Sequence, residues 1–189
     1  MSGGSVVLRR INASDTKNIV KWRNLGSVRV NLYTQTELTE KQQEEWLQTK
    51  VSTGLCAQYI IVVQENGAPI DIGTVFIKNI DRDSNKGEFG IFIGEEAARG
   101  KGYGKQAIRQ MLAVGFGELG LNRIYLTVMA DNLAAIEAYQ DTGFQYEGVL
   151  REDFLRYDGY VDIVAMGLTA KRWREVQTDA VGASDREPQ

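Results

Sequence analysis

The sequence predicts a single α/β (α+β) domain built on a mixed, mostly antiparallel central sheet with helices on its faces. Two β-branched segments that flank the turn Glu65-Asn-Gly67 predict an early hairpin. The order strand, glycine loop, helix and strand over residues 88–129 predicts one parallel crossover. Two final segments around Asp158-Gly159 predict a closing hairpin. One parallel unit among antiparallel neighbours favours this fold class over a doubly wound parallel sheet.

The N-terminal part opens with a strand and two helices. Residues 6–10 form a short strand, and Ser14 or Asp15 is placed to cap a helix that runs to about Asn24. A second helix is marked more clearly, because Thr39-Glu-Lys-Gln42 has the form of a capping box and precedes QEEWLQTK.

The middle of the chain carries the antiparallel strands. Residues 58–64 (QYIIVVQ) are dense in β-branched side chains, and residues 72–80 return as their partner. Residues 88–93 follow the polar segment DRDSNKG as a third strand.

The second half alternates helices and strands. A helix from 102 to about 118 and a strand over 123–129 complete the crossover, and residues 133–141 form another helix. Residues 144–150 and 160–168 close the sheet as strands.

The two ends of the chain are small, polar and aperiodic. Residues 1–5 and 174–189 are therefore expected to be disordered, on either side of one domain over residues 6–173. A length of 189 residues with 43% hydrophobic content suits one domain with a buried core.

Composition excludes several classes of function. The net charge of −3 and a pI near 5.2 give no polycationic surface, which argues against general nucleic-acid or membrane binding. Cys56 is the only cysteine and no run of about 20 apolar residues occurs, so we expect a cytoplasmic protein in which Cys56 is simply buried. The absence of histidine removes His-dependent triads and the common zinc sites, so no metal is expected.

A glycine-rich stretch precedes the helix of the crossover. The segment 97–111 (AARGKGYGKQAIRQM) holds three glycines, and a glycine inside a helix costs roughly 0.5–1 kcal/mol relative to alanine. The glycines are therefore expected in a loop before the helix, where free backbone N–H groups favour an anion. Arg99, Lys101 and Lys105 add positive charge. An ordinary glycine-rich turn is the alternative.

Three phosphate-binding loops compete for this segment. The triphosphate loop GxxxxGK[ST] fails, because Arg99 stands at its first glycine and Gln106 at its Ser or Thr. The dinucleotide fingerprint GxGxx[GA] fits residues 102–107, with Asp131 placed as a ribose-binding acid. The third interpretation takes the run as Arg99-x-x-Gly102-x-Gly104.

Two linked motifs resemble those of the GCN5-related N-acetyltransferases. Arg99-x-x-Gly102-x-Gly104 matches that family's (Q/R)xxGx(G/A) motif, and the preceding GEFGIFIG resembles its preceding strand. Asn132-Leu-Ala-Ala-Ile-Glu-Ala-Tyr139 with Gly143-Phe144 resembles its second signature. The resemblance extends from about Val7 to Trp173. EGVLRED and GYVDIVAMGL are similar to the RimJ/RimL-like subgroup of ribosomal-protein N-terminal, polyamine and nucleotide-amino-sugar acetyltransferases.

The resemblance implies a fold and a cosubstrate. The strand over 88–93 is expected to splay from the strand over 123–129, so that acetyl-CoA enters the gap with its pyrophosphate on the glycine loop and leaves as CoA. The residues that the resemblance assigns to acetyl-CoA are Phe92, Ile93, Arg99, Gly100, Lys101, Gly102, Tyr103, Gly104, Lys105, Asn132 and Ala135.

The resemblance also assigns two catalytic proton carriers. An alkyl amine has a pKa of about 10.4, so its proton must be removed before it attacks a thioester. Glu88 is the candidate general base, directly or through water, and a solvated strand-end carboxylate is its alternative role. Tyr139 is placed to protonate the departing thiolate, and packing in the core is its alternative role.

The acceptor amine is open among a protein N-terminus such as that of a ribosomal protein, a polyamine and an amino sugar. By resemblance, the N-terminal helices and the final hairpin bind it, with Trp22, Arg23, Trp46 and Tyr160 as candidate contacts. Glutamates over residues 37–45 suit a polyamine, or form a solvated helix face.

Homodimers are common among the proteins that the chain resembles.

Two other classes of function remain alternatives. One is a catalytically degenerate acetyltransferase fold that binds CoA as a sensor, and the other is a dinucleotide-binding module. Intact Tyr139 and Asn132 favour an active enzyme.

Overall fold

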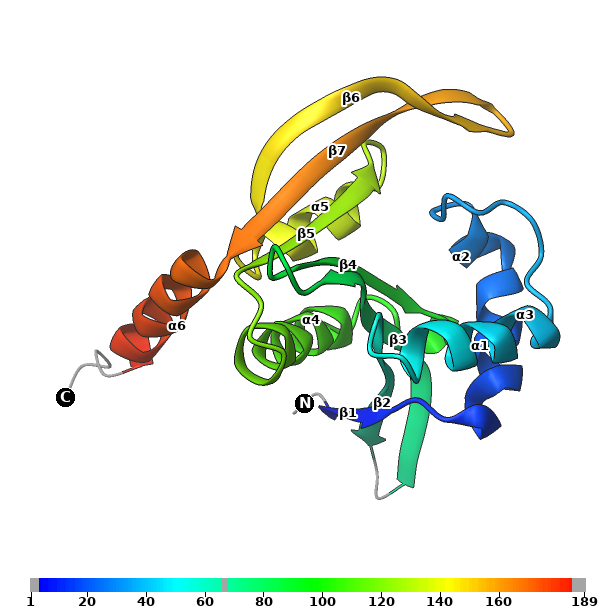
Figure 1. Ribbon diagram of the computed structural model, residues 1–189, viewed down its shortest axis with the longest axis horizontal. Coiled ribbons are helices and arrows are strands. Elements are labelled where there is room, and N and C mark those ends of the chain that lie inside the picture. The colour runs from blue at the N-terminus through cyan, green and yellow to red at the C-terminus, as the bar shows by residue number, and fades with distance from the viewer. Residues whose placement is uncertain (1–3, 66–67, 185–189) are drawn as a thin grey trace.

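A seven-stranded sheet is the framework of the computed structural model, which describes residues 4–65 and 68–184 (Figure 1). The strands are β1 (Ser5–Arg10), β2 (Ala57–Glu65), β3 (Ala68–Asp81), β4 (Lys86–Ile93), β5 (Arg123–Met129), β6 (Gln145–Arg156) and β7 (Gly159–Thr169). They lie in the order β1-β2-β3-β4-β5-β7-β6, and of the neighbouring pairs described only β4 and β5 are parallel. The predicted fold class is therefore confirmed.

Helices cover both faces of the sheet. They are α1 (Thr16–Asn24), α2 (Gly26–Arg29), α3 (Glu40–Trp46), α4 (Tyr103–Ala113), α5 (Leu133–Gln140) and α6 (Ala170–Ser184). Alternation along β2 sends Ile61 into the core that contains α4, and Ile60 into the core that contains Ile19 and Trp22 of α1. Within residues 4–65 and 68–184, no helix is long and apolar enough to cross a membrane.

The predicted helix starts are confirmed at α3 and only partly at α1. The Thr39 hydroxyl accepts the Gln42 N–H and the Gln42 side chain accepts the Thr39 N–H, which completes the capping box. Asp15 stands at the N-cap of α1 without a side-chain capping bond. The cap in this region is Asn12, whose side chain accepts the Ser14 N–H at 2.9 Å and starts a short turn before α1.

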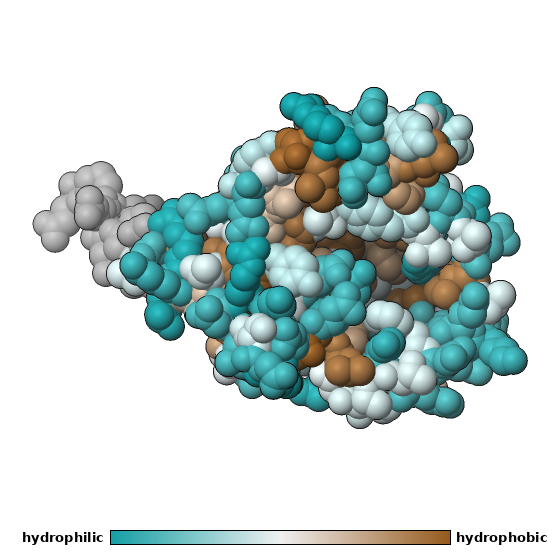
Figure 2. All heavy atoms as spheres, turned by 45° about the horizontal axis from the view of Figure 1, so that its top comes forward, coloured by the Kyte–Doolittle hydropathy of each residue, from teal (hydrophilic) through white to brown (hydrophobic). Residues whose placement is uncertain are grey.

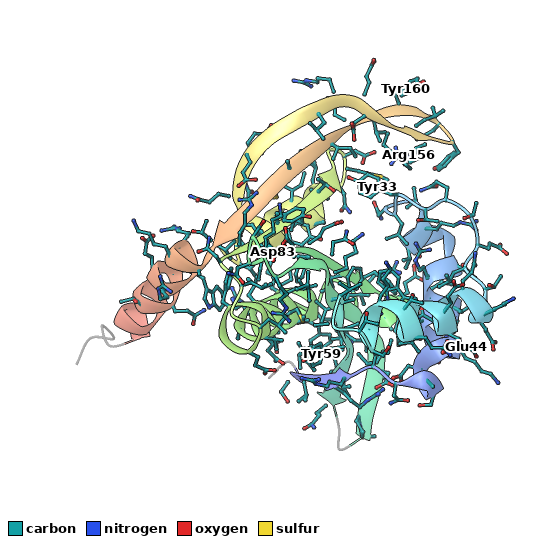
Figure 3. The ribbon with its side chains drawn as sticks, viewed as in Figure 1. Tyr33, Glu44, Tyr59, Asp83, Arg156 and Tyr160 are labelled. Atoms are coloured by element: carbon teal, nitrogen blue, oxygen red, sulfur yellow. The ribbon has the colours of Figure 1, made fainter. Side chains whose placement is uncertain are left out.

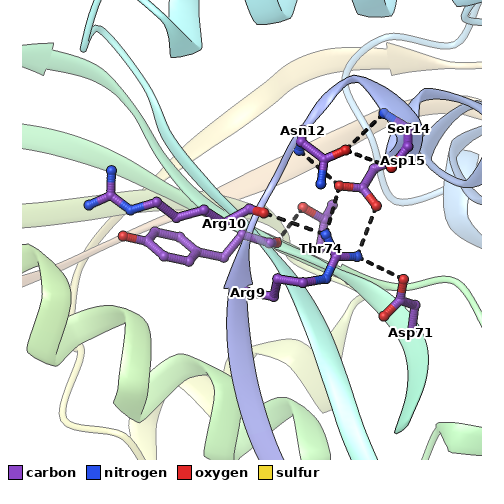
Figure 4. A network of polar contacts seen from close by, with 8 residues as sticks. Arg9, Arg10, Asn12, Ser14, Asp15, Asp71 and Thr74 are labelled. Carbon is purple, nitrogen blue, oxygen red and sulfur yellow. Dashed lines mark hydrogen bonds and ion pairs between the residues drawn. The ribbon is translucent and has the colours of Figure 1, made fainter.

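The Asp15 carboxylate takes part in an ion-pair network instead of capping α1 (Figure 4). The Arg9 guanidinium donates to Asp15 at 2.9 Å and to Asp71 on β3 at 2.8 Å, and Asp15 also accepts the Asn12 N–H at 2.8 Å. The hydrogen bond to Asp15 raises the pKa of Arg9. This network fixes the point where the chain leaves β1 for α1, and so positions one wall of the site.

β4 and β5 pair over only a short part of their length. Their parallel register ends at Glu88 and Tyr125, whereas β3 stays paired with β4 up to Ile93 and β7 stays paired with β5 up to Met129. Beyond that point, no described strand pairs with the backbone N–H and C=O groups of β4 and β5 that face each other across the gap. The splayed strand pair expected from the resemblance is therefore present.

The two ends of the chain are more ordered than expected. Helix α6 covers Ala170–Ser184, so the expected disordered tail is wrong for residues 174–184. Trp173 stacks on Phe116 with ring centroids 5.8 Å apart, and this contact anchors α6 to the turn that follows α4. Ser5 begins β1, so the expected N-terminal tail is also shorter. Residues 1–3 and 185–189 lie outside the described residues.

Candidate active site

A cavity of about 760 Å³ opens where β4 and β5 diverge. β4 from Glu88 to Ile93 and the end of β5 line one side, together with the first turn of α4 and the inner side of α5. The opposite side comes from α1, α3 and the segment 31–38 between α2 and α3. Figure 2 shows a hollow with hydrophobic side chains at its floor. Small-molecule sites measure about 300–1,000 Å³, so the cavity has the size of a ligand site.

The glycine loop presents its backbone to open space at the α4 end of the cavity. Gly100 and Gly102 have φ angles of 73° and 81°, and a Cβ at either position would meet no atom within 4 Å. Glycine is therefore required here by backbone conformation rather than by crowding. Gly102 is the N-cap of α4, whose first N–H groups have no intrahelical acceptor. The loop suits an anion such as a pyrophosphate.

Arg99 adds a buried donor at the same end. Its Nε donates to the Ile93 carbonyl at 3.1 Å, while its Nη2 is buried with no hydrogen-bond partner in the part of the chain that the structure describes. A buried donor without an acceptor beside an open glycine loop fits a cosubstrate that carries phosphate groups.

The structure brings six of the residues assigned to acetyl-CoA to the cavity wall. They are Phe92, Ile93, Arg99, Gly104, Asn132 and Ala135. Asn132 combines this position with capping of α5, because its Oδ1 accepts the Ala135 N–H at 3.3 Å.

The other assigned residues lie in the loop or are occupied elsewhere. Gly100, Lys101 and Gly102 are exposed. Tyr103 is 2% exposed and belongs to the main core. Lys105 is ion-paired with Glu137 and Asp141 on the α5 side, and the hydrogen bond to Asp141 raises the pKa of Lys105. These positions can contribute backbone N–H groups, whereas the Tyr103 and Lys105 side chains already have partners.

Tyr139 reaches the cavity from α5. Its side chain is 8% exposed, and its ring packs against Phe89 and Phe144 at centroid distances of 6.0 and 5.8 Å. Burial raises the pKa of the Tyr139 phenol. The phenol therefore keeps its proton at neutral pH, and can donate it to an anionic leaving group in the cavity.

Glu88 lies at the point where β4 and β5 separate, and it lines the cavity. Its carboxylate pairs with Lys78 Nζ at 3.0 Å and accepts a hydrogen bond from Asn79 Nδ2 at 2.8 Å. Only 20% of the side chain is exposed, so Glu88 is not a fully solvated strand-end carboxylate. Its partners hold it at the cavity wall, where it can accept a proton from a bound amine or water.

The candidate acceptor contacts are divided between the cavity and other places. Arg23 and Trp46 line the cavity. Trp22 is 1% exposed in the core, where its Nε1 donates to Glu95 at 2.6 Å. Tyr160 is 65% exposed near the end of the β6–β7 hairpin (Figure 3). The structure therefore does not bring Trp22 and Tyr160 to the cavity.

Gln43 and Tyr33 also line the cavity, although neither is a candidate from the sequence. Gln43 is 4% exposed and lies one helical turn before Trp46, so the period that follows the Thr39 capping box was a usable signal. Tyr33 lies in the irregular segment after α2 and contacts Phe154 on β6. That position depends on tertiary packing and has no local sequence signal.

The glutamates near α3 do not form an acidic cavity wall. Glu40, Glu44 and Glu45 are exposed, and Glu44 lies on the outside of the molecule (Figure 3). Glu37 lines the cavity but is paired with Arg29 at 3.4 Å. Most of these glutamates therefore belong to a solvated helix face and do not form a polyamine-binding site.

Asp131 and Cys56 are explained by their neighbours. Asp131, the acid needed by the dinucleotide alternative, is paired with Arg156 at 2.7 Å. Cys56 is 2% exposed, and burial raises the pKa of its thiol to about 12. The expectation that Cys56 is a buried structural residue is confirmed.

Comparison with known proteins shows the family of the chain. The family described as "Acetyltransferase (GNAT) domain" matches residues 5–145. The spermidine N(1)-acetyltransferase of Vibrio cholerae serotype O1 is 33% identical over 102 residues, 54% of this chain and 58% of that protein. The L-amino acid N-acetyltransferase AaaT of Escherichia coli is 32% identical over 93 residues, 49% of this chain and 57% of that protein. The chain thus spans little more than half the length of these curated relatives.

Solved structures share the whole fold. The spermidine N-acetyltransferase from Vibrio cholerae, in a complex with CoA and spermine, has a TM-score of 0.82 to this chain at 24% identity. The superposition covers 89% of this chain and 97% of that one.

Proposed function

The chain belongs to the acetyltransferase (GNAT) family, and on that premise we propose that it transfers the acetyl group of acetyl-CoA to a primary amine. The observation that carries the proposal is the cavity between β4 and β5, which has the glycine loop at one end and both Glu88 and Tyr139 on its wall. The loop supplies anion-binding N–H groups, and the two side chains supply a proton acceptor and a proton donor.

The fit of acetyl-CoA rests on two features of this chain. The N–H groups at the start of α4 and the Arg99 Nη2, which has no partner among the described residues, are donors that a ligand with phosphate groups can use. The open edge of β4 as far as Ile93 can pair with the amides of the pantetheine arm as a strand would. Acetyl-CoA supplies an acetyl group activated as a thioester.

The residues of the chain then handle position and protons. Glu88 accepts the proton of the amine, directly or through water, because the ammonium form has no lone pair with which to attack. A backbone N–H of β4 facing the gap stabilises the negative charge that develops on the carbonyl oxygen. Tyr139 donates its phenolic proton to the departing sulfur, and the proton that the nitrogen releases as the amide forms restores the phenol. Holding the amine and the acyl group together supplies much of the remaining rate gain, so no covalent bond to the protein is needed.

For the acceptor, the relatives support a small amine. The Vibrio cholerae relative is named for spermidine, and the Escherichia coli relative for L-amino acids. A protein N-terminus, as in the RimJ/RimL-like subgroup, and an amino sugar complete the panel of acceptors.

Binding and turnover test this proposal separately. A thermal-shift titration compares acetyl-CoA, CoA, NAD, NADP and ATP. A ligand at 100 times its Kd stabilises a protein by about 2.7 kcal/mol, which raises the Tm of a domain of this size by several degrees. We expect a shift with acetyl-CoA and CoA alone, followed by thiol release with at least one amine. A shift with NAD but not with CoA would overturn the proposal and favour the dinucleotide alternative.

A CoA-binding sensor is the second candidate, and one observation favours it. Glu88 already pairs with Lys78 at 3.0 Å, which reduces its availability as a base. A thermal shift with acetyl-CoA, combined with no thiol release across the panel of amines, would favour the sensor over the enzyme.

A further inference from the structure

The side of the cavity formed by α1 and α3 holds two buried hydrogen-bond donors that no described residue satisfies. Nη1 of Arg23 and Nε2 of Gln43 are buried without a partner in residues 4–65 and 68–184, and both residues line the cavity. Gln43 as a whole is only 4% exposed. Leaving such a donor without an acceptor is unfavourable, and more so for a charged group. Two such donors in one wall indicate a ligand that supplies the acceptors.

Other polar groups in the same wall are paired. Trp46 Nε1 donates to Gln58 Oε1 at 3.0 Å, and Gln58 Nε2 donates to the Thr74 hydroxyl at 3.1 Å. The Thr74 hydroxyl donates in turn to the Tyr59 carbonyl at 2.8 Å. Both the oxygen and the nitrogen of the Gln58 amide therefore have hydrogen-bond partners, whereas the amide nitrogen of Gln43 has none among the described residues.

The two donors come from helices that are held together. Asn24, next to Arg23, donates to the Leu38 carbonyl at 2.9 Å and accepts the Leu38 N–H at 2.8 Å. These two bonds fix the end of α1 against the residue that leads into α3. Arg23 and Gln43 therefore reach the same cavity from adjoining helices whose relative position is set.

The cavity provides no anion for Arg23. Its described lining has carboxylates only at Glu37 and Glu88, which are already paired with Arg29 at 3.4 Å and Lys78 at 3.0 Å. Burial lowers the pKa of Arg23, and an adjacent anion would act in the opposite direction. A polycation entering here would meet an unpaired guanidinium and no unpaired carboxylate of the lining.

We propose that Arg23 and Gln43 bind an oxyanion, a carboxylate or a phosphate, that the acceptor amine carries. The inference rests on the proposed function, because it names the acceptor class of the same site. A guanidinium presents a planar fork of N–H groups that matches two oxygens of either group, and the Gln43 amide adds another donor. The acceptor is thus an amine of the amino-acid or phosphorylated-sugar type rather than a bare polyamine.

Matched pairs of acceptors test the inference. Lysine differs from 1,5-diaminopentane by one carboxylate, and glucosamine 6-phosphate differs from glucosamine by one phosphate. We would measure thiol release with acetyl-CoA and, separately, calorimetric binding of each amine to protein saturated with CoA. For at least one pair, we expect kcat/KM and affinity to be about tenfold to a hundredfold higher for the oxyanion-bearing member. The pair that shows the difference identifies the oxyanion.

Variants connect the preference to the two residues. Arg23→Met keeps the length of the side chain without its charge, and should abolish the preference while the acetyl-CoA thermal shift remains. Arg174→Met is the control, since Arg174 is an exposed arginine on α6 that does not line this cavity. If Arg23→Met does not fold, Gln43→Leu provides the same comparison, with a smaller loss of preference expected.

The outcomes separate the two proposals. Equal or better use and binding of the bare amines, an unchanged preference in Arg23→Met, or no binding of either oxyanion-bearing compound would each overturn the oxyanion site. Preferential binding that depends on Arg23, without thiol release from any amine, would support the oxyanion site and count against acetyl transfer.

Discussion

The ring of Tyr33 meets the ring of Phe154 edge-on, with centroids 5.3 Å apart and planes at 86°. Tyr33 belongs to the segment between α2 and α3, and Phe154 belongs to β6, so this contact links the N-terminal helices to the β6–β7 hairpin (Figure 3). Tyr33 also lines the cavity. The pair therefore joins two segments that are far apart in the sequence, on the side of the cavity proposed for the acceptor.

Loss of this contact should weaken acceptor binding more than cosubstrate binding. An edge-on aromatic pair contributes about 0.5–1.5 kcal/mol, so Tyr33→Ala or Phe154→Ala should raise the KM for the amine by about two- to tenfold. Steady-state kinetics with each substrate varied in turn would check this. Tyr157→Ala is the control, because Tyr157 is 80% exposed on the same hairpin. An equal rise in the KM for acetyl-CoA would contradict the prediction.

Gly102→Ala should weaken acetyl-CoA binding beyond its effect on stability. A left-handed backbone costs a non-glycine residue about 1–2 kcal/mol, and the new methyl group would also enter the open space before the loop. Gly54→Ala is a matched control, because Gly54 has a φ of 75°, also has no atom near its Cβ position and lies in the turn before β2, outside the glycine loop. Denaturant unfolding should show similar destabilisation in both variants, and acetyl-CoA titration should show weaker binding only in Gly102→Ala.

Tyr139→Phe should separate catalysis from binding. The ring and its contacts with Phe89 and Phe144 remain, so the stability cost should stay below about 1.5 kcal/mol. Loss of the proton donor should lower kcat by about 10²–10⁴-fold, with the acetyl-CoA thermal shift retained. Tyr59→Phe, in the core but outside the cavity, should leave kcat unchanged. Full activity of Tyr139→Phe would assign the hydroxyl no part in proton transfer.

Glu88→Gln should lower kcat by about 10²-fold, because the amide cannot accept the proton of the amine. Lys78→Met removes the ion-pair partner and keeps the carboxylate, so it should retain most of the turnover. Thiol-release kinetics of both variants would distinguish the two roles of Glu88. A parallel loss of activity in the two variants would indicate that the ion pair, and not proton transfer, is what matters.

Glu95 should make stability depend on pH. Hydrogen bonds from Trp22 and then Lys21 hold the pKa of Glu95 below its ordinary value of 4.5. A carboxyl group with a lowered folded-state pKa stabilises the fold above its unfolded-state pKa, and this contribution is lost as the pH falls through the folded-state value. The Tm difference between wild type and Glu95→Gln should therefore be largest near neutral pH, and should shrink below about pH 4.5.

Thermal unfolding at several pH values would check the Glu95 prediction. Glu118→Gln is the control, since Glu118 is 62% exposed and its pair with Arg10 is 3.8 Å long. A Tm difference for Glu95→Gln that does not change with pH would show that the effect is one of packing.

Local signals predicted most of the elements, and pairing between distant strands decided the exceptions. Residues 123–129 were predicted with both ends correct as β5, because aromatic and β-branched residues fill that segment. β6 continues past Leu150 to Arg156, although charged residues follow Leu150. Pairing with β7 carries it, across an irregularity between Leu150 and Phe154. Similarly, the Trp173–Phe116 contact, rather than the composition of the tail, explains the start of α6.

The site residues also fall into two groups, those that local motifs indicate and those that depend on tertiary packing. The glycine loop and Tyr139 lie in contiguous motifs, so their chemistry could be predicted from the sequence. Trp22 is a candidate acceptor contact from the sequence, but it packs in the core beside Ile19, whereas Arg23, four residues after Ile19, lines the cavity together with Ile19. The helical period places Gln43 on the side of Trp46, but the absence of a described partner for its amide nitrogen can be recognised only when its neighbours are placed.

The short register between β4 and β5 divides a single sheet into two parts that share few backbone pairs. One part contains β1 to β4 and the other contains β5, β7 and β6, and among the strands that the structure describes they are joined only by the register from Lys86–Arg123 to Glu88–Tyr125. A molecule that pairs with the edge of β4 adds backbone hydrogen bonds across this seam, as an inserted strand would. The free energy of occupying the cavity is then also free energy of holding the two halves together.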